Sequence, residues 1–193
     1  DLHRCSATGE REAIVREKGT NGDREMAFAM HAAGFDVLDI TMHDLMCGAA
    51  RLEWVDVLVF PGGFSNSDVL GAGRGWAAAF LHNPRAMAEL RGFYTRPNTL
   101  SLGVCNGCQL MAELDLIAAP DQPGFKMRRN LSRKFESAFL TVEVMPTRSV
   151  MLGPLAGLKL GVWIAHGEGR FSLPAGEAAY DIPLRYYYSC LLY

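Results

Sequence analysis

The sequence predicts an α/β protein of the flavodoxin-like type, with a mostly parallel central sheet, helices on both faces and a small antiparallel extension. Strand-like and helix-like segments alternate over residues 11–117, and the strand-like segments are near-continuous apolar runs, which is typical of strands buried on both faces. After Pro120, short apolar segments joined by loops favour antiparallel pairing. With 193 residues the chain can build one full core, so we expect a single domain over residues 1–193.

Local signals place the individual elements. Asp23 is a candidate N-cap for a helix whose apolar residues recur at helical spacing, and Gly34 stands where its C-terminus is expected. Pro84 occupies the first position of another helix. Residues 71–75 lack the spacing of a dinucleotide-binding fingerprint and are expected to form a flexible loop that leads into a helix. The expected strands are residues 13–15, 35–40, 55–60, 99–104, 128–130, 139–144 and 161–164, and the other expected helices are residues 84–93 and 108–116.

Composition and charge exclude several classes of function. A net charge of -2 provides no excess of positive charge for binding nucleic acid or an anionic membrane surface. The chain has no apolar run long enough to span a bilayer, and its first residues do not form a signal peptide. Five cysteines at irregular spacing do not make a disulfide framework. We therefore expect a cytoplasmic protein whose partners are neither nucleic acid nor membrane.

Cys105 lies at the point where an apolar strand is expected to turn directly into a helix. Small flanking residues, Gly103 and Gly107, permit the sharp backbone that such a turn requires. The helix that follows directs its free N–H groups and positive dipole end at the sulfur, which favours the thiolate. This pattern predicts a cysteine nucleophile for acyl transfer.

The same segment allows a second interpretation. Cys105 and Cys108 form a C-x-x-C pair at the start of a helix, a pattern typical of thiol-disulfide oxidoreductases. That alternative gives no role to Gly103, Gly107 or Gln109. A zinc site would need a second cysteine pair, and the remaining cysteines are isolated in the sequence: Cys5, Cys47 and Cys190.

A Gly-Gly turn ends the central strand of the expected sheet, at Pro61-Gly62-Gly63. In open α/β sheets ligands bind at the carboxyl ends of the strands. Backbone N–H groups at this turn, together with the N–H of Asn106, are therefore candidates for a two-donor oxyanion hole.

A thiol nucleophile also needs a base and a group that orients the base. His166 follows an apolar strand in the sequence His166-Gly167-Glu168-Gly169, which makes His166 a candidate base and Glu168 its candidate partner. Surface or structural roles are expected for the other histidines, which fall in a terminal tail, a helix, a loop and a helix terminus: His3, His31, His43 and His82.

At these positions the chain resembles class I glutamine amidotransferases, which use a Cys-His-Glu triad. More narrowly, it is similar to the C-terminal glutaminase domain of the large form of phosphoribosylformylglycinamidine synthase. The resemblance extends over about residues 12–178, and the segments that carry it are residues 16–26, 59–65, 101–111 and 165–171.

The resemblance implies that Cys105 attacks the side-chain amide of L-glutamine, forms a glutamyl thioester and releases ammonia. An ATP- and Mg²⁺-dependent synthetase region, the expected partner, would use the ammonia to make formylglycinamidine ribonucleotide in purine biosynthesis. The glutaminase domain itself needs no cofactor or metal. The family pattern assigns oxyanion donors to Gly63 and Asn106, and glutamine-binding positions to Gly62, Gly63, Phe64 and Gln109.

The family places its triad histidine and glutamate in a later Pro-His-Pro-Glu segment, which is absent from this sequence. The resemblance fades after Ala178, residues 179–193 form an atypical tail, and residues 1–9 also differ from the family. On the family pattern, His166 and Glu168 line the site instead of serving as its dyad. We therefore expect impaired glutamine turnover. A second alternative is that the chain is a non-catalytic domain that docks on a synthetase.

Overall fold

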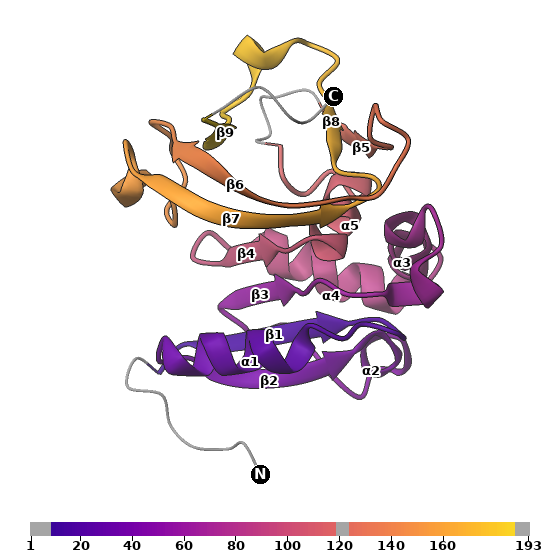
Figure 1. Ribbon diagram of the computed structural model, residues 1–193. Helices are drawn as coiled ribbons and strands as arrows, with labels where there is room; N and C mark the ends of the chain where they lie inside the picture. Colours follow the sequence, from indigo (N-terminus) through magenta and orange to yellow (C-terminus); the bar gives the residue numbers. More distant parts are fainter. Residues whose placement is uncertain (1–8, 119–123, 188–193) are drawn as a thin grey trace. The chain divides into compact units, whose positions relative to one another are not determined.

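The computed structural model describes residues 9–118 and 124–187, and the chain divides into two compact units at Leu114 and Asp115 (Figure 1). The first unit contains a four-stranded parallel sheet in the order β2-β1-β3-β4. Its elements are β1 (Arg11–Arg16), α1 (Asp23–Ala32), β2 (Asp36–Thr41), α2 (Met42–Cys47), β3 (Val57–Phe60), the 3₁₀ segment η1 (Ser65–Asp68), α3 (Ala72–Leu81), α4 (Pro84–Tyr94), β4 (Leu100–Gly103) and α5 (Asn106–Glu113).

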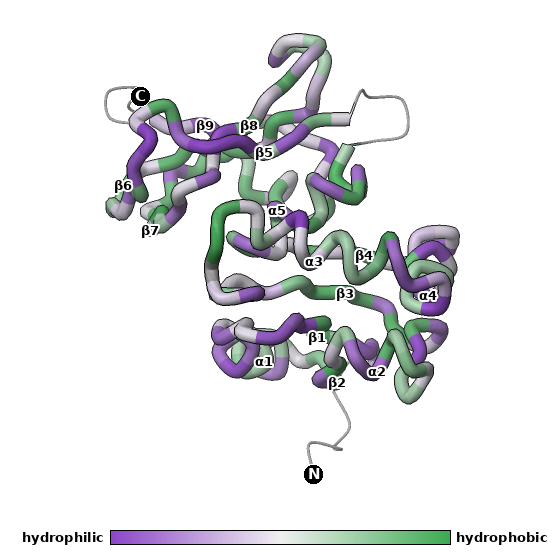
Figure 2. Tube along the Cα trace, turned by 90° about the vertical axis from the view of Figure 1, so that its right-hand side faces the viewer, coloured by the Kyte–Doolittle hydropathy of each residue, from purple (hydrophilic) through white to green (hydrophobic). Residues whose placement is uncertain are grey.

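Helices cover both faces of this sheet, as predicted. All four residues of β3 are buried, and Figure 2 shows this strand as a hydrophobic segment. Because alternate residues of a strand point to opposite faces, Val57 and Val59 pack with Met26 and other residues of α1 on one side. On the other side the ring of Phe60 makes an edge-to-face contact with Trp76 of α3, with centroids 5.9 Å apart. The core of the first unit is therefore built around β3.

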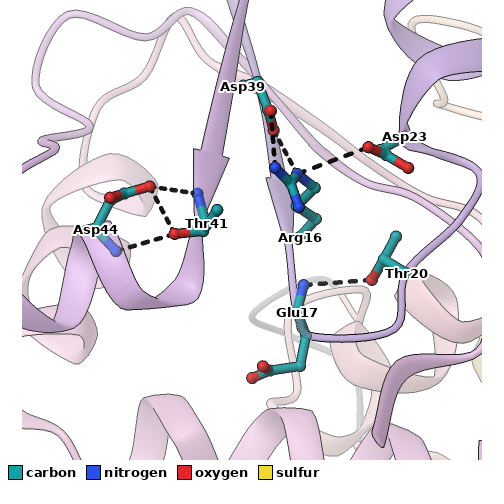
Figure 3. A network of polar contacts seen from close by, with 7 residues as sticks. All are labelled: Arg16, Glu17, Thr20, Asp23, Asp39, Thr41 and Asp44. Atoms are coloured by element: carbon teal, nitrogen blue, oxygen red, sulfur yellow. Dashed lines mark hydrogen bonds and ion pairs between the residues drawn. The ribbon is translucent and has the colours of Figure 1, made fainter. Parts of the chain in front are cut away.

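The structure corrects three predictions in the first unit. Asp23 is the first residue of α1, and the N-cap is Gly22, which has no side chain to cap the helix. The Asp23 carboxylate instead lies 3.6 Å from Nε of Arg16. The segment around His43 is the helix α2 and not a loop. Thr41 and Asp44 cap that helix with reciprocal hydrogen bonds (Figure 3). The expected loop over residues 71–75 is already helical from Ala72.

The second unit is made of antiparallel strands, as the change in pattern after Pro120 predicted. One sheet pairs β5 with β8, and the other has the order β7-β6-β9. The elements are β5 (Lys126–Arg128), β6 (Glu136–Val144), η2 (Gly153–Leu155), β7 (Lys159–His166), β8 (Arg170–Ser172), η3 (Glu177–Ala179) and β9 (Leu184–Tyr186).

Two details of the second unit differ from expectation. His166 is the last residue of β7 and does not follow the strand. The atypical tail contributes β9, which pairs with the end of β6 through Val144 and Leu184. The expectations for His3, Cys5 and Cys190 fall outside the described residues. Over residues 9–118 and 124–187, every helix is too short or too polar to cross a membrane.

Candidate active site

Cys105 stands on the turn between β4 and α5 with a backbone that few residues adopt. Its φ is 51° and its ψ is -108°, and its side chain is exposed. A non-glycine residue in this region costs on the order of 1–3 kcal/mol and persists only where the surroundings hold it. Here the N–H of Val104 donates to the carbonyl of Phe60 at 3.0 Å, and the N–H of Gln109 donates to the carbonyl of Cys105 at 3.1 Å. The elbow is thus held by both the sheet and the helix.

Glycines allow α5 to approach the sheet closely at this elbow. A Cβ at Gly107 would overlap the carbonyl of Phe60 in β3, and a Cβ at Gly103 would lie 2.5 Å from Sδ of Met111. No side chain fits at either position without moving the helix. The glycines that flank Cys105 therefore have a packing role that a simple C-x-x-C motif does not require.

The Gly62-Gly63 turn lies directly beside the cysteine. A Cβ at Gly62 would be 3.1 Å from the Cβ of Cys105. The turn is braced from the other side by the loop after β1, since Thr20 forms a β-bridge with Gly63 and the N–H of Gly22 donates to the carbonyl of Gly62 at 3.3 Å. A Cβ at Gly63 would meet the backbone nitrogen of Asn21 at 2.5 Å. The loop over residues 19–22, which lies in the family-like segment 16–26, therefore supports the candidate site.

Charged side chains hold the start of that supporting loop (Figure 3). Arg16 makes a two-pronged contact with Asp39, with Nε and Nη2 at 2.7 and 3.0 Å from the two carboxylate oxygens. Just beyond it, the N–H of Glu17 donates to Oγ1 of Thr20 at 3.3 Å. The Arg16 and Asp39 side chains are partly exposed, so we expect the pair to fix geometry more than to add stability.

A buried polar chain connects the two candidate oxyanion segments. Ser65, just after the glycine turn, donates its hydroxyl hydrogen to Oδ1 of Asn106, and both residues are buried. Nδ2 of Asn106 then donates to Oε1 of Gln109 at 2.8 Å. Residues 62, 63, 65, 105, 106 and 109 are thus gathered at the carboxyl ends of β3 and β4. Sequence reasoning missed Ser65, and Phe64 beside it is half exposed.

Cys108 differs from Cys105 in its surroundings. Burial, with a smaller effect of the neighbouring Cys105, raises the pKa of Cys108 to about 11. Cys108 is therefore protonated at neutral pH. Cys105 and Cys108 are not joined by a disulfide. Of these two cysteines Cys105 is the exposed one, so it is the better candidate for attack on a substrate.

The candidate base and its partner lie in the second unit. Nδ1 of His166 is 3.0 Å from Oδ1 of Asn130, and Asn130 is buried. Burial lowers the pKa of His166, while Glu136, opposite it on β6, acts in the other direction. Because Cys105 belongs to the first unit, its pairing with His166 and Glu168 stays a prediction. The other described histidines are exposed, as expected for surface roles: His31, His43 and His82.

Taken together, fold and site define an α/β protein with a cysteine elbow at the carboxyl edge of a parallel sheet. A model of the CobB/CobQ-like glutamine amidotransferase domain matches residues 10–188. The chain belongs to this family of glutamine amidotransferase domains. The matched span extends beyond residue 178, where the resemblance was expected to fade.

Individual relatives agree with this assignment. The chain is 48% identical over 189 residues to phosphoribosylformylglycinamidine synthase of Homo sapiens, covering 91% of this chain and 14% of that protein. It is 44% identical over 176 residues to the Drosophila melanogaster protein of the same name, covering 89% of this chain and 13% of that one. The chain therefore spans about one seventh of the length of these relatives.

A solved structure supports the fold class. A chain in the structure of PurLQS from Thermotoga maritima superposes with a TM-score of 0.68 at 24% sequence identity, covering 93% of this chain and 75% of that chain. A glutamine amidotransferase from Thermotoga maritima superposes with a TM-score of 0.52 at 15% identity, covering 92% of this chain and 71% of that chain. These likenesses confirm the predicted α/β fold.

Proposed function

We propose that this chain is a glutaminase domain in which Cys105 attacks the side-chain carboxamide of L-glutamine. The observation that carries the proposal is the elbow itself. The exposed thiol of Cys105 lies at the N-terminus of α5 on a backbone with φ 51°. The neighbouring glycine turn places no side chain against it. In a family of glutamine amidotransferase domains, that arrangement suits an acyl acceptor.

The proposed reaction proceeds in two steps. The thiolate of Cys105 adds to the carboxamide carbon, the C–N bond breaks, and the nitrogen leaves as ammonia after taking up a proton. Water then adds to the resulting thioester, the C–S bond breaks, and glutamate and the thiol are released. Both steps pass through an oxyanion, so groups that stabilise negative charge on that oxygen accelerate each of them.

We assign the oxyanion donors to the N–H groups of Gly63 and Asn106. The loss of one such donor typically costs about 3–4 kcal/mol of transition-state stabilisation. The hydrogen bond between Ser65 and Asn106 supports the assignment, because it links the two segments that would provide the donors. Gly62, Gly63, Phe64 and Gln109 are proposed to bind the rest of the glutamine side chain.

The group that would deprotonate Cys105 is the weakest match to the family pattern. His166 with Glu168 is the candidate dyad, but the family's Pro-His-Pro-Glu segment is absent from the sequence. Loss of one member of a nucleophile–base unit lowers turnover by orders of magnitude. We therefore propose that the chain on its own binds glutamine and turns it over slowly.

The similarity to phosphoribosylformylglycinamidine synthases suggests where the ammonia goes. We propose that it passes to an ATP- and Mg²⁺-dependent synthetase region that aminates formylglycinamide ribonucleotide in purine biosynthesis. In this scheme the glutaminase domain itself requires neither metal nor cofactor.

An ammonia-release assay with L-glutamine tests the proposed function. We expect slow release by the chain, no release above background by Cys105→Ala, and unchanged release by Cys47→Ala, which removes an exposed thiol from α2. Release that survives Cys105→Ala would refute the role of Cys105. Turnover at ordinary enzyme rates would refute the proposed impairment and favour His166 as the base.

A further inference from the structure

Asn130 is the centre of a hydrogen-bonded cluster in the second unit that the proposed reaction does not explain. The residue is 7% exposed and lies between β5 and β6 in the sequence. Its backbone N–H donates to the carbonyl of Gly167 at 2.9 Å. Its side chain contacts both ends of the short segment from His166 to Gly169. One buried amide therefore organises the whole segment.

The backbone partners decide which way the Asn130 amide faces. The N–H of Gly169, 3.1 Å away, can only donate, so the atom that it contacts is Oδ1. The carbonyls of Lys134 and His166, at 3.0 and 2.8 Å, can only accept, so the atom between them is Nδ2. A flipped amide would lose all three hydrogen bonds.

This orientation determines the proton position on the imidazole of His166. Nδ1 lies 3.0 Å from Oδ1 of Asn130, and an amide oxygen can only accept. Nδ1 must therefore carry the hydrogen. In the neutral ring the other nitrogen, Nε2, then holds the lone pair.

The ring is also held in place from a second side. A Cβ at Gly169 would overlap the imidazole of His166, so a glycine is required where the backbone passes the ring. The N–H of the same glycine shares Oδ1 of Asn130 with Nδ1. His166 is thus fixed in position and in tautomer by one amide and one glycine.

We propose that Asn130 is a positioning residue that holds His166 as the Nδ1–H tautomer, so that Nε2 is the nitrogen that accepts a hydrogen bond or a proton from a ligand. A group with an N–H or O–H donor, such as an amide or an ammonium ion, fits this acceptor, and a carboxylate does not. The inference does not depend on whether the chain hydrolyses glutamine.

The charges near His166 are consistent with a neutral ring at neutral pH. Burial lowers its pKa more strongly than Glu136 on β6 raises it. Two other charged residues are close to His166 in sequence. Glu168 belongs to the same segment. Arg170 is the first residue of β8, and its Nε donates to the carbonyl of Arg129 at 3.3 Å. The geometry of Asn130, and not any single charge, selects the protonated nitrogen.

Nuclear magnetic resonance of the ¹⁵N-labelled chain tests the proposal directly. Long-range ¹H–¹⁵N spectra at neutral pH should show His166 with a protonated Nδ1 and an unprotonated Nε2, with the signals assigned by their loss in His166→Gln. In Asn130→Ala the ratio of Nδ1–H to Nε2–H should fall about fivefold, the value of one hydrogen bond. Asn130→Asp should restore the Nδ1–H tautomer and raise the pKa of His166, because a carboxylate still accepts from Nδ1.

Two controls separate positioning from a general effect on folding. Asn83→Ala removes the N-cap of α4 in the first unit and should leave the His166 spectrum unchanged. Glu136→Gln should lower the pKa of His166 without changing the tautomer. A wild-type spectrum with Nε2–H as the main neutral form would overturn the proposal, and this result needs no variant to fold. An unchanged tautomer in a folded Asn130→Ala would overturn it as well.

Discussion

Glu12 is a carboxylic acid buried in β1, and its ionisation should control the stability of the first unit. The side chain has no exposed surface, and in the described part of the chain neither carboxylate oxygen has a hydrogen-bond partner. Burial raises its pKa from 4.5 to about 8. Because folding favours the protonated form, the associated stability is fully present below about pH 4.5 and is lost as the pH rises through about 8.

The size of the effect follows from these two values. At about 1.4 kcal/mol for each pH unit, the interval from 4.5 to about 8 corresponds to about 5 kcal/mol once the pH exceeds both values, and to about 3 kcal/mol at pH 7. Glu12→Gln keeps the shape of the protonated side chain and removes the ionisation. We expect the variant to match the wild type near pH 4.5 and to be more stable by about 3 kcal/mol near pH 7.

Urea denaturation at a series of pH values, followed by circular dichroism, measures this difference. Glu10→Gln, which makes the same charge change at an exposed position just before β1, is the matched control and should retain the wild-type pH profile. Parallel profiles for the wild type and Glu12→Gln between about pH 5 and 8 would refute the reasoning.

Two further predictions concern the packing and polar contacts of the candidate site. Gly107→Ala should lower the free energy of unfolding by about 2 kcal/mol or more, since its Cβ would overlap the carbonyl of Phe60. Gly92→Ala, in open space on α4, should instead stabilise by up to about 1 kcal/mol, and equal effects in urea denaturation would contradict the packing argument. Ser65→Ala should destabilise by about 1–3 kcal/mol because it leaves Oδ1 of Asn106 buried without the hydroxyl donor, and a neutral result in the same assay would argue against that hydrogen bond.

Much of the first unit could be predicted because its strands are long apolar runs and its helix ends carry local signals. α4 begins at Pro84, as the sequence indicated, and Asn83 caps it by accepting a hydrogen bond from the N–H of Ala86. α2 was missed because it has only six residues, too few for a periodic apolar pattern. Its capping pair, Thr41 and Asp44, was the available signal.

Tertiary packing explains the error over residues 71–75. Gly73 and Gly75 suggested a loop, but both lie inside α3. A Cβ at Gly73 would be 2.7 Å from the Cβ of Gln109, so this glycine allows α3 to approach α5 closely. The helix is formed because packing between helices outweighs the low helix propensity of glycine. A single sequence does not reveal that contact.

The candidate site was predictable in part for a similar reason. The elbow at Cys105 has a local signature, a strand-like run, small residues and a helix-like run in immediate succession. Ser65 and Asn130 had none, because their partners Asn106 and His166 are 41 and 36 residues away in sequence. Such contacts depend on the completed sheets, which bring distant segments together.

The central claim, that Cys105 is the nucleophile for the glutamine amide, is tested most directly by covalent labelling. The probe is a glutamine analogue with an electrophilic carbon in place of the side-chain amide, and the site of modification is read by peptide mass spectrometry. We predict modification of Cys105 in preference to Cys47, which is also exposed, and protection of Cys105 by excess L-glutamine. Equal modification of the two cysteines, or modification of Cys105 that L-glutamine does not slow, would contradict the account.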